Sequence, residues 1–202
     1  MKIFGIGMFK TGTTTLGRAL SNLGFSVFNG PWTTEGEIYC NTWNPNLNHF
    51  KDYKKSILEK VEAYDAFADY PFMYIYPLLD QWFPGSLFIY TERDPYAVAH
   101  SDRAMWLRKG KPLFSIPPTR DFVERYDRHQ HEVLKYFAGR KDFLKVNWAS
   151  GNGWEKLCDF LNCPVPNHPF PHRNPGSYTI KQELKLATSE ILVNLAPWWK
   201  QF

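Results

Sequence analysis

The chain has 202 residues, of which 44% are hydrophobic and 22% charged, and a formal net charge of +4. These proportions are those of an ordinary folded protein, and the length suits a single domain over residues 1–202 with a core that needs neither disulfide nor metal. The mild positive charge includes no dense basic run, which argues against a general nucleic-acid partner and fits a small anionic ligand.

The sequence also lacks the marks of a membrane or metal protein. No run of about 18 apolar residues predicts a membrane span, and the first apolar residues are too few for a signal peptide, so we expect a cytoplasmic protein. Cys40, Cys158 and Cys163 are odd in number and lack a paired Cys-x-x-Cys spacing, which predicts reduced thiols or packing residues. We expect no metal site.

Apolar periodicity and turn residues predict strands that alternate with helices along the chain. The predicted strands cover residues 3–6, 25–28, 66–69, 86–91 and 143–148. The sequence predicts one helix after Gly12, helices over 51–64 and 75–83, and a helix that begins at Asp94-Pro95. Further helices are predicted after Pro118, over 154–161 and in a C-terminal segment. Residues 30–48 and 164–175 are expected to be loops. This alternation predicts an α/β fold in which helices cover both faces of a central parallel sheet.

The turn after the first strand is the most informative segment. Residues 7–16 read Gly-Met-Phe-Lys-Thr-Gly-Thr-Thr-Thr-Leu. Glycines allow a close backbone approach to an anion, and the N-terminus of the following helix favours negative charge. Lys10 adds a full positive charge, so we expect this turn to bind a phosphate or a similar group.

Two better-known phosphate loops fit this turn less well. Gly7 and Gly12 have the spacing of a nucleoside triphosphatase loop, but Thr13 stands where that loop has lysine. A dinucleotide-binding loop would need Gly5, Gly7 and a third small residue where Lys10 stands. An ordinary glycine-containing strand-to-helix turn is the remaining alternative.

A second anion site is predicted after the strand at 86–91. Arg93 follows this strand at the edge where open α/β sheets bind ligands, and Ser101 lies about two helical turns beyond the Asp94-Pro95 helix start. A guanidinium and a hydroxyl can hold one phosphate from two directions. Taken alone, the pair is better explained as a surface arginine paired with Asp94 and a serine on a solvated face.

The two segments together resemble the sulfotransferases that use 3′-phosphoadenosine 5′-phosphosulfate (PAPS). Lys10-Thr11-Gly12-Thr13-Thr14 resembles their 5′-phosphosulfate loop, and residues 93–101 resemble their 3′-phosphate segment. Residues 153–157 and 170–174 are similar to later parts of a small, mainly prokaryotic branch. The resemblance implies a three-layer α/β/α, P-loop nucleotide-kinase-like fold. It also implies in-line transfer of a sulfuryl group from PAPS to a hydroxyl or amine of a small-molecule acceptor, with adenosine 3′,5′-bisphosphate (PAP) as product.

The resemblance assigns roles at matched positions only. Lys10 would support the leaving oxygen, and Asp69 stands where the cytosolic branch has its catalytic histidine, which makes it the candidate base. Trp148 resembles an aromatic residue on the adenine side, and His172 and Arg173 lie in a loop that would close over the nucleotide. The implied cofactor-binding set is Gly7, Lys10, Thr11, Gly12, Thr13, Thr14, Arg93, Ser101, Trp148 and Arg173.

Three departures from the family pattern leave alternatives open. Thr15 replaces a tryptophan that stacks on adenine, Phe67 replaces a second lysine, and Asp69 replaces the histidine. A P-loop kinase that uses ATP and Mg²⁺, and a nucleotide-binding protein without turnover, are the alternatives. The sequence identifies neither the acceptor, although 32–43 and Met105-Trp106 could line its pocket, nor the oligomeric state.

Overall fold

The computed structural model describes residues 1–29, 47–171 and 178–195, and these form two compact units. The first comprises Met1–Glu92 and Gly139–Asn174, and the second comprises Arg93–Ala138 and Pro175–Phe202. Each unit is built from two separate stretches of the chain. That residues 1–202 behave as a single domain stays a prediction.

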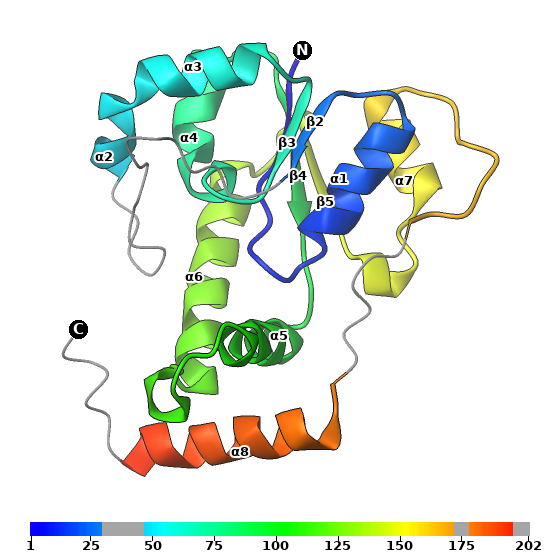
Figure 1. Cartoon of the computed structure of the whole chain (residues 1–202). Coiled ribbons are helices and arrows are strands. Elements are labelled where there is room, and N and C mark those ends of the chain that lie inside the picture. Colours follow the sequence, from blue (N-terminus) through cyan, green and yellow to red (C-terminus); the bar gives the residue numbers. More distant parts are fainter. Residues whose placement is uncertain (30–46, 172–177, 196–202) are drawn as a thin grey trace. The chain divides into compact units, whose positions relative to one another are not determined.

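The first unit contains a parallel sheet of five strands (Figure 1). The strands are β1 (Ile3–Gly5), β2 (Val27–Asn29), β3 (Ala66–Ala68), β4 (Leu87–Thr91) and β5 (Phe143–Val146). Their order is β2-β3-β1-β4-β5, and every neighbouring pair is parallel. The predicted central parallel sheet is confirmed, and β1 lies between β3 and β4, so the turn after β1 emerges between the ends of both neighbours.

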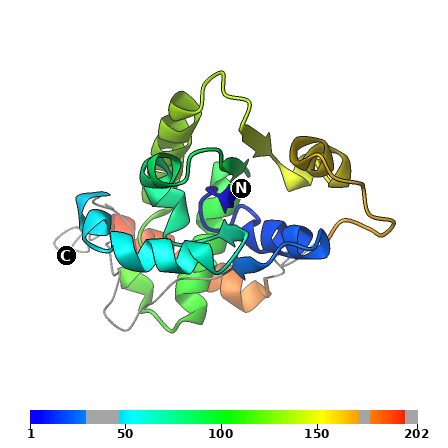
Figure 2. The same ribbon diagram turned by 90° about the horizontal axis from the view of Figure 1, so that it is seen from above.

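Helices cover both faces of this sheet, as Figures 1 and 2 show. On one face, α1 (Thr13–Asn22) and α7 (Trp154–Leu161) pack against Ile3, Ala66 and Ile89. On the other, the rings of Phe4 and Phe67 contact Phe72 of α4 (Phe72–Trp82), with centroids 6.1 and 4.9 Å away, and the Phe88 ring lies 5.6 Å from that of Phe4. Successive strand residues point to opposite faces, so both faces are apolar and the three-layer α/β/α arrangement follows.

Two further helices complete the described part of the first unit, α2 (Leu47–Asp52) and α3 (Lys54–Glu62). The helix predicted over 51–64 is confirmed over Lys54–Glu62, but the helical path breaks at Tyr53, and residues 51 and 52 belong to α2. Phe50, Ile57 and Val61 are all buried and keep helix-like spacing across the break. Periodicity alone therefore does not reveal it. The helix predicted over 75–83 begins earlier, at Phe72.

The second unit is helical in its described residues. It contains α5 (Pro95–Arg108), a 3₁₀ turn η1 (Leu113–Ser115), α6 (Thr119–Tyr136) and α8 (Ile180–Leu195). Asp94 caps α5 by accepting a hydrogen bond from the Ala97 N–H at 2.8 Å, and Pro95 occupies the first turn, which confirms the predicted start of this helix. None of the helices in the described ranges has the length and apolar character needed to cross a bilayer.

Candidate active site

The turn after β1 packs directly on the end of β4. A Cβ atom at Gly7 would overlap the Thr91 side chain and lie 2.5 Å from the Thr91 carbonyl oxygen. Thr91 itself is fully buried. Gly7 is therefore required by the close contact between the turn after β1 and the end of β4, whether or not a ligand is bound.

The Thr11 hydroxyl is engaged inside the protein. It donates to the Met8 carbonyl oxygen at 2.6 Å and lies 2.6 Å from the Thr91 hydroxyl, and Thr11 is only 2% exposed. Thr11 thus shapes the turn through its side chain. Sequence reasoning missed Thr91, although a hydroxyl residue at the end of the apolar strand 86–91 was a usable signal.

Gly12 begins α1 in a left-handed conformation, with φ 101° and ψ 27°. No side chain in the described part of the chain caps this helix, and its first turn contains no acidic residue. Thr13 is buried and Thr14 is exposed. The uncapped N–H groups and the positive end of the helix dipole make this end of α1 suited to an anion.

Trp148 supports the same turn from the side. Its indole N–H donates to the Gly12 carbonyl oxygen at 3.2 Å, and a Cβ at Gly12 would collide with the indole ring. The predicted strand over 143–148 ends at Val146, because the Asn147 side chain accepts from the Ala149 N–H and starts the 3₁₀ turn η2 (Trp148–Ser150). Trp148 therefore lies beyond β5, against the turn, and its contact with adenine stays a prediction.

An aromatic layer lies behind Trp148. The Phe170 ring centroid is 4.8 Å from Trp148 and 5.0 Å from Trp154. Trp154 donates its indole N–H to the His168 carbonyl oxygen at 2.8 Å. Sequence reasoning did not single out Phe170, which connects α7 to the residue that supports Gly12.

Lys10 and Asp69 follow adjacent parallel strands, β1 and β3, and both have left-handed backbones, with φ 67° and 82°. This conformation is uncommon for residues other than glycine and concentrates at functional sites. Asp69 is half-buried, and its Oδ1 accepts from the Tyr70 N–H at 2.9 Å. Burial raises the pKa of Asp69, while the Tyr70 N–H and the Lys10 charge oppose this rise.

The second unit holds the other predicted anion-binding residues. The Arg93 N–H donates to the hydroxyl of buried Tyr126 of α6 at 3.1 Å, which fixes the start of the segment before α5. Ser101 is half-buried on α5. The residue after it, Asp102, is buried and pairs with Arg125 of α6 at 2.8 Å. These contacts hold the backbone on either side of the two candidate side chains.

Some predicted residues lie outside the described ranges. These are Arg173, His172 and the aromatic segment 32–43, so nothing structural bears on their roles. His100 is described, and its Nε2 lies 2.9 Å from the Glu183 carboxylate. Within the described residues, no group of three or more histidine, cysteine or acidic side chains is arranged to hold a metal ion.

Comparison with known families assigns the chain. A model of the sulfotransferase domain matches residues 2–119 and 103–178, which is most of the sequence. The chain belongs to the sulfotransferase family. The suspected family relationship is thereby confirmed.

The individual proteins to which this sulfotransferase is similar share little sequence identity with it. It is 25% identical over 211 residues to Ava biosynthesis cluster protein M of Aspergillus versicolor, covering 85% of this chain and 80% of that protein. Among solved structures it is similar to the sulfotransferase STF9 of Mycobacterium avium, with a TM-score of 0.51, 11% identity, and coverage of 97% of this chain and 68% of the other. At this identity the likeness supports the fold alone.

Proposed function

We propose that this sulfotransferase moves a sulfuryl group from PAPS to a hydroxyl or amine group of a small-molecule acceptor. The observation that carries the proposal is the pair Lys10 and Asp69, a cation and a carboxylate at the ends of adjacent strands in left-handed backbone conformations. The pair offers what group transfer needs, a positive charge for the leaving group and a base for the incoming one.

The chemistry of the turn fits the phosphosulfate end of PAPS. Lys10 and the uncapped N–H groups at the start of α1 are all hydrogen-bond donors, and no carboxylate in the first turn of α1 opposes an anion. We assign the 5′-phosphosulfate to Lys10, Gly12, Thr13 and Thr14. Thr11 and Gly7 serve this site by shaping the turn.

We assign the 3′-phosphate of PAPS to Arg93 and Ser101, on the strength of the motif at 93–101 and the family. A guanidinium and a hydroxyl suit a phosphate dianion. The backbone hydrogen bond from Arg93 to Tyr126 and the Asp94 cap of α5 fix the main chain around the arginine. Arg173 remains a candidate for the same nucleotide, and Trp148 for its adenine.

PAPS supplies an activated sulfuryl group whose transfer needs in-line approach of the acceptor and stabilisation of the leaving phosphate, as in phosphoryl transfer. In this account Lys10 neutralises charge that grows on the leaving oxygen. Asp69 accepts the proton of the acceptor hydroxyl, and its raised pKa makes it a stronger base than an ordinary aspartate. The bond from the Tyr70 N–H to Oδ1 orients the carboxylate.

The test is transfer of labelled sulfate from PAPS to a panel of phenols, alcohols and amines. Lys10→Ala should lower kcat strongly, because its charge matters most in the transition state, whereas Arg93→Ala should chiefly raise the KM for PAPS and the Kd for PAP. Arg108→Ala, an exposed site at the end of α5, is the matched control. A Lys10→Ala enzyme with unchanged kcat would contradict the assignment of Lys10.

A further inference from the structure

Two cysteines, Cys158 and Cys163, lie at the C-terminal end of α7, away from the residues assigned to catalysis. Asn162 ends the helix in a left-handed conformation, with φ 51° and ψ 50°. Its N–H bonds the Asp159 carbonyl oxygen at 3.2 Å, and the Cys163 N–H bonds the Cys158 carbonyl oxygen at 3.0 Å. This pair of bonds is the Schellman motif, which places the two residues joined by the outer bond as close neighbours on one side of the helix end.

The backbone places the two cysteines within disulfide range. The 3.0 Å bond joins the Cys163 nitrogen to the Cys158 oxygen. With standard bond lengths, the two Cα atoms are then at most about 7 Å apart. Cysteines whose Cα atoms are farther apart than this cannot be bridged without backbone movement. The separation of the two Cα atoms therefore permits a disulfide, which a change of the side-chain rotamers would close.

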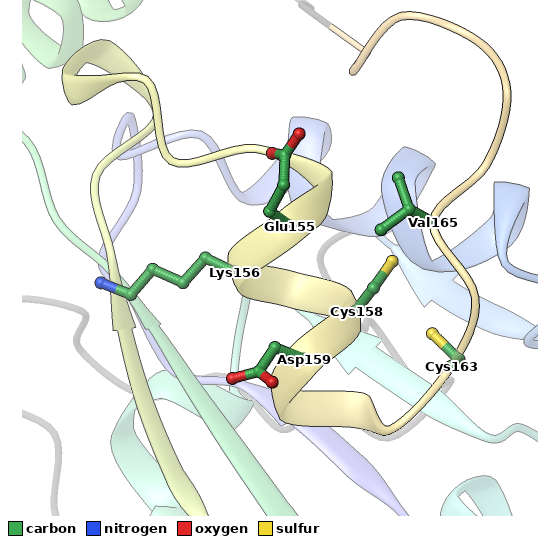
Figure 3. Close-up of a pocket in the computed structure, with 6 residues that line it drawn as sticks. All are labelled: Glu155, Lys156, Cys158, Asp159, Cys163 and Val165. Atoms are coloured by element: carbon green, nitrogen blue, oxygen red, sulfur yellow. The ribbon is translucent and has the colours of Figure 1, made fainter.

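The two thiols share a surface pocket of about 660 Å³ (Figure 3). Its other lining residues are Glu155, Lys156, Asp159 and Val165. Cys158 is 1% exposed, whereas Cys163 is half-buried. A small reagent in the pocket thus has access to Cys163 first, with Cys158 behind it.

We propose that Cys158 and Cys163 form an oxidisable dithiol, which hydrogen peroxide converts into an intramolecular disulfide. The Cys163 sulfur attacks a peroxide oxygen, the O–O bond breaks, and a sulfenic acid and one water form. The Cys158 sulfur then attacks the Cys163 sulfur, the S–S bond forms, and the S–O bond breaks with release of a second water. The two thiols lose two electrons and two protons, which the peroxide takes up.

The surroundings agree with this order of events. Burial, together with the neighbouring Cys163 thiol and the Glu155 charge, raises the pKa of Cys158 to about 11, so this cysteine stays a neutral thiol near neutral pH. Cys163 is therefore the first to react and Cys158 the resolving residue. The pocket lining carries the carboxylates of Glu155 and Asp159 and one cation, Lys156, and this excess of negative charge favours an uncharged peroxide over an anionic disulfide reagent.

Peptide mapping tests the proposal directly. Trypsin releases residues 157–173 as one peptide that contains both cysteines and no internal lysine or arginine. The full chain with Cys40→Ser is treated with hydrogen peroxide, alkylated and digested. We expect this peptide to be lighter by two hydrogen atoms and to carry no alkyl group, and to take two alkyl groups after reduction. A peptide that takes two alkyl groups despite oxidant, or carries sulfinic acid on Cys163 beside an alkylated Cys158, would overturn the proposal.

Two further measurements separate the dithiol from a single reactive thiol. In Cys158→Ala, oxidation should stop at the Cys163 sulfenic acid, which dimedone traps. In the chain with only Cys40→Ser, phenylarsine oxide, which condenses with two neighbouring thiols, should bind one-to-one and protect both cysteines from alkylation. If phenylarsine oxide does not bind the reduced, folded chain, the two sulfurs do not come together. The proposal is then wrong even if dimedone labels Cys158→Ala.

Discussion

At the scale of single residues, Thr91 is the contact between β4 and the turn after β1. Its hydroxyl lies 2.6 Å from the Thr11 hydroxyl, and its backbone leaves room only for glycine at position 7. Thr91→Val keeps the shape but removes the hydroxyl. We expect a loss of about 1–2 kcal/mol in the free energy of unfolding, as for a buried hydrogen bond left without one partner.

Denaturant unfolding measures this loss, with Thr188→Val on the exposed face of α8 as a control that should change stability by less than about 0.5 kcal/mol. Because the turn is also the proposed anion site, Thr91→Val should weaken PAP binding as well. A Thr91→Val chain as stable as the parent would show that the two hydroxyls do not support each other.

Asp69 carries the acid–base part of the proposed mechanism. Asp69→Asn keeps the size and an oxygen for the Tyr70 N–H but removes the basic group. We expect kcat to fall by roughly 10²–10⁴-fold, the usual scale for lost acid–base catalysis. PAP affinity should be nearly unchanged, and the acidic limb of the pH profile of kcat should disappear. Turnover like that of the parent enzyme would mean that the base is elsewhere.

The raised pKa of Asp69 also predicts a pH-dependent stability. The folded chain binds the Asp69 proton more tightly than the unfolded chain, so this group contributes stability at low pH that is lost as pH rises through its raised folded pKa. At neutral pH, Asp69→Asn should therefore unfold at an equal or higher temperature than the parent. The difference should shrink when both are melted below the usual aspartate range, and a reversed trend would contradict the raised pKa.

At the scale of elements, Arg103 ties the helices of the second unit together. It is 4% exposed and donates to Ser189 at 3.0 Å and Thr119 at 3.0 Å, and it forms an ion pair with Glu190. These partners belong to α8 and to the first turn of α6. Arg103→Ala should cost about 3 kcal/mol, the low end for breaking a buried ion pair, because Glu190 keeps partial solvent contact.

The matched control for Arg103→Ala is Arg108→Ala on the same helix, which should be nearly neutral. Glu190 adds a pH signature. Burial raises the pKa of Glu190, but hydrogen bonds from Thr119 and the charge of Arg103 outweigh this, so the pKa is lowered overall. Its contribution is present above the ordinary glutamate pKa and lost as pH falls through the lower folded value. Arg103→Ala should therefore lose less stability on acidification than the parent.

The elements themselves show what the sequence could and could not predict. The start of α5 followed from Asp94-Pro95, since capping is a local signal, and α7 was predicted at the residues where it occurs. The break at Tyr53 was missed because the apolar spacing continues through it. The strand predicted to reach Trp148 ends at Val146, where the Asn147 side chain begins a turn.

The candidate site likewise has features that the sequence predicts and features that it does not. The turn at 7–16 was found from glycine spacing and the lysine, which are local features. The contacts of Thr91 with Thr11 and of Trp148 with Gly12 join residues 80 and 136 positions apart. Such pairs depend on the strand order of the sheet. A single sequence, taken alone, does not specify the order of the strands.

At the scale of the whole molecule, the single-domain prediction can be tested by calorimetry. Each compact unit is assembled from two separate stretches, so the chain passes between the units three times. We expect one cooperative transition with equal calorimetric and van't Hoff enthalpies. Two resolved transitions would show instead that the units unfold independently.

The central claim is that the chain binds a PAPS-type nucleotide through its own side chains and backbone. The most direct test is a thermal-shift titration of PAP in the presence of a chelator, compared with ATP plus Mg²⁺. PAP at about 100 times its Kd should stabilise the fold by roughly 2.7 kcal/mol, and Arg93→Ala should reduce the shift more than Lys10→Ala does. Protection by ATP with Mg²⁺ but not by PAP would contradict the account and favour a kinase.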